Sequence, residues 1–248
     1  MNMPAIEGVI ERRLLVNYRV VPEALNGILP TPFRPKLVQG YAIAGICLIR
    51  LANLRPRGLP AAIGLHSENA AHRIAVEWDA NGGTHEGVYI PRRDSDSCIS
   101  AAVGGRIFPG RHHRAFFEVA ESDDHFDVAL RSSDGRTRVR VAGRIAASLP
   151  SESVFANLDE ASAFFRCGSI GYSATDHAGC YDGLELRVAE WRVEPLAVER
   201  VASSFFDDPR NFPAGTATFD CALVMRDVVH SWHSLPALSE SQLNAPAA

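Results

Sequence analysis

The spacing of apolar residues along this chain favours β-strands over helices. Short segments rich in Val, Ile, Leu and Phe alternate with polar positions, and clusters of Gly, Pro, Asn or Asp separate them. This pattern predicts strands at residues 13–20, 37–51, 71–78, 87–90, 115–120, 126–131, 136–142, 184–188 and 189–195. Strands at such short intervals are typical of a barrel or sandwich, whereas a βαβ sheet would place a helix between successive strands.

Three local patterns sharpen this picture. Residues 37–51 form a long apolar stretch with β-branched residues, which favours a buried strand over a helix. The Asn-Gly-Gly sequence at 81–83 lies between two predicted strands and predicts a hairpin. In 136–142, three arginines alternate with Thr and Val, which predicts a half-exposed strand whose arginines face water.

Two short helices are predicted between the strands. One covers residues 23–29, which follow one proline and precede three others. The second covers residues 157–165, where Asn157 or Asp159 can cap the first turn and Gly168 follows the last. The chain is therefore expected to be mainly β, in the α+β class.

The length of 248 residues and a hydrophobic fraction of 46 % are enough for a sizeable core. No flexible linker divides the chain, so we expect a single domain over residues 12–237. Residues 1–11 would form an N-terminal segment. The small, polar residues 238–248 are expected to be a disordered tail.

Charge and composition exclude several classes of protein. A net charge of −4 argues against a general nucleic-acid or membrane-surface binder. The longest apolar run is too short to span a bilayer, and the N-terminus lacks the apolar segment of a signal peptide. Five scattered cysteines without a CxxC pair do not suggest a disulfide framework. We expect a cytoplasmic protein with no nucleic-acid or membrane partner, and the sequence leaves a homo-oligomer open.

No cofactor or metal site is expected. The chain contains no P-loop, no G-x-G-x-x-G fingerprint and no G-x-S-x-G elbow. His112 and His113 are adjacent, so on a strand they would point apart. His230 and His233 would share a face only on a helix, and the intervening Trp232 suggests packing.

Of 25 basic residues, only Lys36 is a lysine. Chemistry that needs a neutral amine, such as imine formation with a ketone, therefore has a single candidate. Arginine cannot replace it, because the guanidinium group stays charged and is a poor nucleophile.

The first candidate site lies in residues 66–73 (HSENAAHR), between a Pro/Gly-rich loop and a predicted strand. His72 and Glu68 are the residue types that most often transfer protons. On an extended segment, Glu68 and His72 share one face, and Asn69 and Arg73 share the other. The alternative interpretation is a solvated loop that leads into an edge strand.

The second candidate site lies in residues 84–94 (THEGVYIPRRD). Arg92 and Arg93 follow a predicted strand and could clamp a carboxylate or phosphate through paired hydrogen bonds. Asp94 could partly neutralise them. The alternative interpretation is an exposed basic turn.

Three segments resemble the acetoacetate decarboxylase-like superfamily. These are Tyr18-Arg19 with the Pro-rich residues 28–33 (ILPTPF), the apolar strand at 41–51, and residues 85–93 (HEGVYIPRR). The resemblance spans roughly residues 12–235. It implies a curved, mostly antiparallel β-barrel with a few short helices and a central pocket.

One departure from the family's pattern bears on the chemistry. Glu86 and Pro91 match the decarboxylase segment R-E-x-x-x-x-P-K-K, which carries the imine-forming lysine. Arg92 and Arg93 replace its two lysines. The resemblance therefore supports the fold and the pocket, but not an imine mechanism.

The chain is more closely similar to a branch of this superfamily that is a domain of unknown function. Members of that branch carry segments like Glu68-Asn69…Arg73 and Gly87-Val88-Tyr89. We expect Asn69, Arg73 and Tyr89 to be among the residues that contact the ligand.

The expected function is binding of a small anionic molecule, a carboxylate or oxo acid, held by Arg73 or by Arg92 and Arg93. Any catalysis would be lyase-, hydratase- or isomerase-type proton transfer, with arginine stabilising an enolate. The alternatives are a ligand-binding protein without catalysis and a structural or assembly protein. The candidate acid–base residues are Glu68, His72 and Glu86. At least two of five residues should line the pocket: Glu68, His72, Arg73, Glu86 and Arg92.

Overall fold

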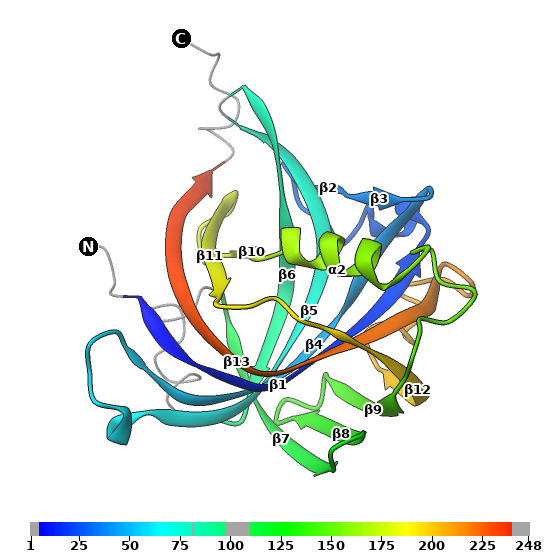
Figure 1. The fold of residues 1–248 in the computed structure, drawn as a ribbon. Helices are drawn as coiled ribbons and strands as arrows, with labels where there is room; N and C mark the ends of the chain where they lie inside the picture. The colour runs from blue at the N-terminus through cyan, green and yellow to red at the C-terminus, as the bar shows by residue number, and fades with distance from the viewer. Residues whose placement is uncertain (1–4, 81, 98–109, 240–248) are drawn as a thin grey trace.

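The computed structural model describes residues 5–80, 82–97 and 110–239, and most of them belong to one curved sheet (Figure 1). The strands are β1 (Ile6–Val20), β2 (Arg34–Pro35), β3 (Leu37–Val38), β4 (Tyr41–Pro56), β5 (Leu65–Ala80), β6 (Gly83–Ser95), β7 (His112–Glu121), β8 (His125–Ser132), β9 (Arg138–Ile145), β10 (Ile170–Ala174), β11 (Cys180–Val188), β12 (Glu194–Ser203) and β13 (Ala217–Ser239). The described helices are the 3₁₀ helices η1 (Pro22–Leu25) and η2 (Ala61–Ile63) and the α-helix α2 (Leu158–Cys167).

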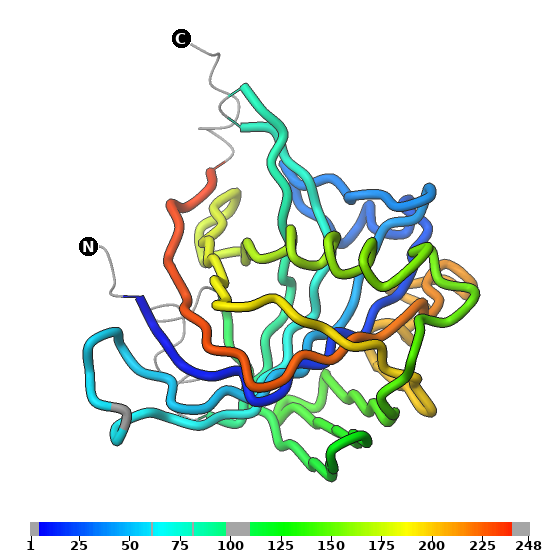
Figure 2. The backbone as a smooth tube through the Cα atoms, in the orientation of Figure 1, coloured from blue at the N-terminus to red at the C-terminus, as the bar shows by residue number. Residues whose placement is uncertain are grey.

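The strand order is β11-β10-β6-β7-β8-β9-β12-β13-β1-β4-β5-β2, and β3 pairs with β4. Two further pairings, β11 with β13 and β5 with β6, turn this path back on itself. The tube in Figure 2 shows the resulting curvature. Neighbouring strands are antiparallel except where β6 meets β7 and β10. The expected curved, mostly antiparallel β-architecture is confirmed.

Apolar side chains fill both faces of the central strands. In β1, Leu14 and Val16 belong to one core cluster and Leu15 to another, and all three are buried. This two-sided burial explains why the segment at 41–51, which forms most of β4, is continuously apolar rather than alternating.

Helix α2 covers the second cluster and crosses the concave side of the sheet in Figure 1. The side chain of Asn157 caps it by accepting a hydrogen bond from the Glu160 N–H at 2.9 Å, and Gly168 follows its last turn. Ala161 and Phe165 are its buried residues. The predicted helix at this position is confirmed.

The predicted hairpin is also confirmed, since β5 and β6 pair from Ala80 and Gly83 onward. In β9, Val139 and Val141 are buried and the alternating arginines are exposed, as expected. The segment at 23–29 differs, because only the four residues Pro22–Leu25 form a helix there, and it is 3₁₀.

The strand predicted at 189–195 was wrong over its first five residues, because β12 begins at Glu194. Trp191 lies in the intervening segment and donates a hydrogen bond to Ser162 of α2 at 3.0 Å, so this segment packs on the helix. Strand β13 was not anticipated. It includes Leu238 and Ser239, and the remainder of the predicted tail lies outside the described residues.

Candidate functional site

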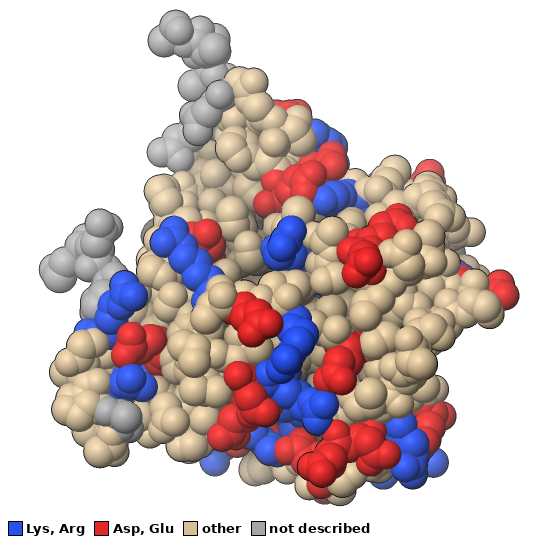
Figure 3. Space-filling model, in the orientation of Figure 1, with Lys and Arg blue, Asp and Glu red and all other residues tan. Residues whose placement is uncertain are grey.

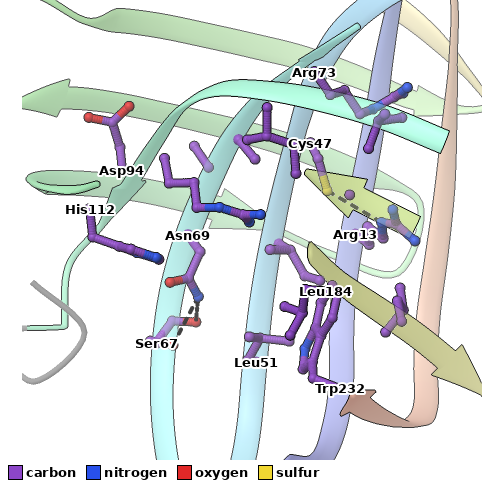
Figure 4. A pocket seen from close by; sticks show the side chains of 18 of the residues that line it. Arg13, Cys47, Leu51, Ser67, Asn69, Arg73, Asp94, His112, Leu184 and Trp232 are labelled. Atoms are coloured by element: carbon purple, nitrogen blue, oxygen red, sulfur yellow. Dashed lines mark hydrogen bonds between the residues drawn. The ribbon is translucent and has the colours of Figure 1, made fainter. Parts of the chain in front are cut away.

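A cavity of about 90 Å³ lies on the concave side of the sheet (Figure 4). It is bounded by side chains from β1, β4, β5, β6, β7, β11 and β13. The apolar part of its wall consists of Ile49, Leu51, Leu54, Val88, Ile90, Leu184, Leu186 and Trp232. The polar part includes Arg13, Cys47, Ser67, Asn69, Arg73, Arg93, Asp94, His112 and Ser169.

Strand register decides which side chains reach this cavity. Residues directly opposite each other on neighbouring strands share a face of the sheet. One such row runs from Leu15 through Cys47 and Ala71 to Arg93. Cys47 and Arg93 therefore lie on the same side of the sheet, although 46 positions separate them in the sequence.

A parallel row explains the placement of Arg73. It runs from Asn17 through Gly45 to Arg73, and an Arg73 Nη donates a hydrogen bond to Asn17 Oδ1. Gly45 leaves room for this contact, because a Cβ at that position would lie 2.3 Å from the Val16 carbonyl oxygen and 3.3 Å from Asn17 Oδ1. The guanidinium carbon of Arg73 lies 5.0 Å from the ring centre of Phe165 in α2.

Arg13 enters the cavity from β1 and is 8 % exposed. Its Nε–H donates to Cys47 Sγ at 3.3 Å, a contact marked in Figure 4. Its guanidinium carbon lies 5.8 Å from the ring centre of Trp191. These contacts position the side chain but supply no negative charge.

The cavity carries uncompensated positive charge. Buried nitrogens of Arg13, Arg73 and Arg93 have no hydrogen-bond partner, and none of the three forms an ion pair within the described residues. Burial lowers the pKa of Arg73 and of Arg93 to about 10 in each case. Both side chains still carry a proton at neutral pH, so the cavity presents three cations.

Asp94 does not neutralise this charge. Its carboxylate accepts hydrogen bonds from Arg92, the shortest at 2.8 Å, and in Figure 4 it lies at the opposite end of the site from Arg13. Burial raises the pKa of Asp94, and the Arg92 guanidinium opposes that shift.

Of the eight site residues expected from the sequence, the cavity brings together Asn69, Arg73 and Arg93. Glu68 lies on the other face of β5, where it pairs with Arg12 at 2.5 Å and with Arg50 at 2.6 Å. The predicted alternation along this segment is confirmed, and it separates Glu68 from the cavity.

His72 lies on the same face of β5 as Glu68, away from the cavity, and it is fully buried. Its ring centre lies 4.8 Å from that of Phe205, and neither ring nitrogen has a hydrogen-bond partner. Burial, with the nearby Arg92 cation, lowers its pKa to about 3. These surroundings are those of a core residue.

The three remaining candidates also lie outside the cavity wall. Arg92 forms ion pairs with Asp94 at 2.8 Å and with Asp134 at 3.1 Å. Tyr89 packs in an aromatic cluster. Glu86 pairs with Lys36 in a smaller pocket, which shares Arg13 and Arg73 with the main cavity.

Sequence reasoning missed Arg13, Cys47 and His112 as cavity residues. A signal for Arg13 was present, because Arg12-Arg13 interrupts a strongly apolar strand and alternation requires one of the two to point inward. The same rule separates His112, which lines the cavity, from His113, whose Nδ1 lies 3.3 Å from Asp134.

Acidic and basic side chains are interspersed over the face shown in Figure 3, so the arginine cavity contrasts with a mixed surface. Within the described ranges, no group of three or more His, Cys, Asp and Glu residues is arranged to hold a metal ion. The helices in those ranges are too short or too polar to cross a membrane.

Solved structures with a similar fold belong to the acetoacetate decarboxylase group. Acetoacetate decarboxylase from Legionella pneumophila superposes with a TM-score of 0.61 at 9 % identity, covering 95 % of this chain and 88 % of that one. An acetoacetate decarboxylase-like enzyme from Sphingomonas wittichii gives 0.59 at 12 % identity, covering 96 % and 95 %. The enduracididine biosynthesis enzyme MppR, in complex with pyruvate, gives 0.58 at 12 % identity, covering 96 % and 91 %.

At these identities the likeness concerns the fold alone. No curated protein matches the chain in sequence. A family of uncharacterised conserved proteins, DUF2071, does match it over residues 9–214. This chain, whose fold is that of the acetoacetate decarboxylase-like proteins, therefore belongs to the DUF2071 family.

Proposed function

We propose that this protein binds a small carboxylate of the oxo-acid type in the cavity that Arg13, Arg73 and Arg93 surround. The observation that carries the proposal is the set of buried guanidinium nitrogens without a partner. The one carboxylate among the described residues of the cavity wall, Asp94, is engaged by Arg92.

The energetics favour an anionic occupant. A buried charge without a partner is costly, and each unsatisfied buried polar group costs about 1–3 kcal/mol. A carboxylate would accept hydrogen bonds from several of these nitrogens at once, and such charge-assisted bonds are short and strong. Arginine also suits a planar carboxylate better than a lysine would.

The size and polarity of the cavity narrow the ligand class. The cavity has a volume of about 90 Å³. Measured in the same way, one water molecule needs about 10–15 Å³. The cavity therefore has room for a molecule of only a few non-hydrogen atoms. Apolar residues such as Ile49 and Leu184 line the remaining wall and would contact a short carbon chain. The pyruvate complex of MppR, a protein of similar fold, agrees with this ligand class.

Catalysis, if it occurs here, would use the arginines to stabilise an enolate rather than an imine. Lys36 is absent from the cavity wall and pairs with Glu86. Among the residues of that wall, His112 is better placed for proton transfer than His72, which is buried against Phe205 on the other face.

Isothermal titration calorimetry with pyruvate, acetate and the uncharged pyruvamide tests the proposal. The carboxylates should bind to the purified protein with one site per chain, and pyruvamide should bind at least tenfold more weakly, because it cannot pair with the arginines. The Arg138→Gln variant controls for a general effect of losing one positive charge, because Arg138 is an exposed arginine of β9. It should bind pyruvate as the unsubstituted protein does. Equal affinity for pyruvate and pyruvamide would refute the proposal.

A further inference from the structure

Cys47 occupies an unusual position among the arginines of the cavity. It lies on β4, between β1 and β5, and it is 7 % exposed. Its sulfur accepts the Arg13 Nε–H at 3.3 Å (Figure 4). This hydrogen bond holds the sulfur beside a guanidinium group inside the cavity.

The other two arginines also interact with Cys47. Burial lowers the pKa of Arg73 and of Arg93, and the nearby Cys47 opposes part of this shift in both cases. Three guanidinium groups therefore share one ionisable sulfur, and Arg13 and Arg73 are both more than nine-tenths buried with a nitrogen that has no partner.

The other described cysteines have different surroundings. Cys221 is fully buried, and burial, together with the adjacent Asp220, raises its pKa to about 12. Cys167, at the end of α2, is exposed and lines the smaller pocket, which includes Arg13 and Arg73. Cys180, at the start of β11, is half-buried and lies outside the wall of the main cavity. Among the cysteines that the structure describes, Cys47 alone lines the main cavity and accepts a hydrogen bond from an arginine.

We propose that Cys47 is a nucleophile that attacks the electrophilic carbon of a small carboxylate held by Arg13, Arg73 and Arg93. This inference rests on the proposed carboxylate site and adds a covalent step to it. The ligand class is a carboxylate with its electrophilic carbon next to the carboxyl group, as in a 2-oxo acid.

The step balances without a further reactant. With a 2-oxo acid, the sulfur forms a bond to the carbonyl carbon, the π pair of the carbonyl moves to its oxygen, and that oxygen receives the proton of the thiol. The product is a hemithioketal, and the step is reversible. With iodoacetate, the sulfur bonds to the methylene carbon, iodide leaves with the pair of the broken bond, and the thiol proton passes to the buffer.

Alkylation resolved by peptide mass spectrometry tests the inference. The intact chain is treated at pH 7 with iodoacetate or with iodoacetamide, which have the same reactive carbon but differ in charge. Cys47 should react with iodoacetate at least tenfold faster than the more exposed Cys167 and should prefer iodoacetate to iodoacetamide by at least tenfold. Pyruvate should slow Cys47 and leave Cys167 unchanged.

Variants identify the source of the effect. Arg93→Gln should reduce the iodoacetate preference of Cys47 at least fivefold, whereas Arg138→Gln should not change it. If Cys47 reacts more slowly than Cys167 with both reagents, the inference is overturned, and calorimetry still decides the carboxylate site. If Cys47 reacts rapidly with both reagents and pyruvate gives no protection, the inference as stated is also overturned, and the failure then lies in the anion site rather than in the sulfur.

Discussion

Arg92 and Arg93 are adjacent in the chain, but they lie on opposite faces of β6. Arg92 is opposite His72 and forms ion pairs with Asp94 and Asp134. Arg93 is opposite Ala71 and lines the arginine cavity. The pair therefore cannot clamp one ligand together, and only the second arginine belongs to the proposed anion site.

This geometry predicts different outcomes for two adjacent substitutions. Arg93→Gln should weaken pyruvate binding at least tenfold, because a hydrogen bond to a charged group contributes about 1.5–3 kcal/mol. Arg92→Gln should change the affinity less than threefold but should lower the melting temperature, since it leaves the buried Asp94 carboxylate without its partner. Calorimetry and thermal unfolding of both variants measure these effects. The reverse order of the two affinities would contradict the assignment of faces.

A second prediction concerns Glu68, which ties β5 to β1 and β4 through Arg12 and Arg50. Glu68→Gln should reduce the free energy of unfolding by about 1.5 kcal/mol, because the buried Arg12 loses one of its two charged partners and keeps Glu121 at 2.9 Å. Pyruvate affinity of the folded variant should remain within a factor of two. Urea unfolding and calorimetry measure the two quantities. A loss of ligand binding with unchanged stability would instead make Glu68 part of the site.

A third prediction concerns acid stability. The pKa of His72 falls from 6.5 in the unfolded chain to about 3 in the folded one, chiefly through burial. Between these values the unfolded chain binds a proton that the folded chain does not, so stability falls as the pH drops through this window. The slope from this residue is about 1.4 kcal/mol per pH unit inside the window. His230, with a pKa lowered to about 4 by burial and by Arg13, adds to the same trend.

His72→Phe isolates this contribution. Its ring nitrogens have no partner to lose, so the variant should stay within about 1 kcal/mol of the parent protein at pH 7. Between pH 6 and pH 4.5 its stability should fall less steeply than that of the parent, as followed by urea unfolding. His66→Gln, at an exposed position, should retain the steep slope. Identical slopes for all three proteins would show that His72 does not titrate as described.

The fourth prediction is that no imine forms. Lys36 pairs with Glu86, and its Nζ lies 4.8 Å from the ring centre of Phe164, outside the wall of the main cavity. Imine formation needs a neutral amine next to the bound carbonyl group. Incubation with acetoacetate or pyruvate followed by borohydride should leave the intact mass unchanged. A reduced adduct that disappears in Lys36→Met would contradict the prediction.

Sequence patterns predicted the architecture well where local signals were strong. The alternation of arginines with Thr and Val at 136–142 identified the solvent-exposed face of β9. Asn157 and Gly168 marked the two ends of α2. Strand β13 was not predicted, because charged and polar residues such as Asp220 and Arg226 interrupt its apolar positions. Its pairing with β1, β11 and β12 is a property of the whole sheet rather than of the segment.

The site was harder to predict because register decides it. The pairing of β5 with β6 shifts by one residue between His72 and Ile74. Without this irregularity, Arg92 rather than Arg93 would lie opposite Ala71, and every side chain beyond it would change faces. A shift of this kind leaves no clear mark in the sequence.

The central claim is that a small carboxylate occupies the cavity between Arg13, Arg73 and Arg93. A crystal structure of the protein grown with pyruvate tests it most directly. The account predicts one pyruvate in this cavity, with its carboxylate about 3 Å from nitrogens of at least two of the three arginines. Pyruvate bound elsewhere, or a cavity in which Asp94 has turned to pair with Arg93 and no ligand enters, would contradict it.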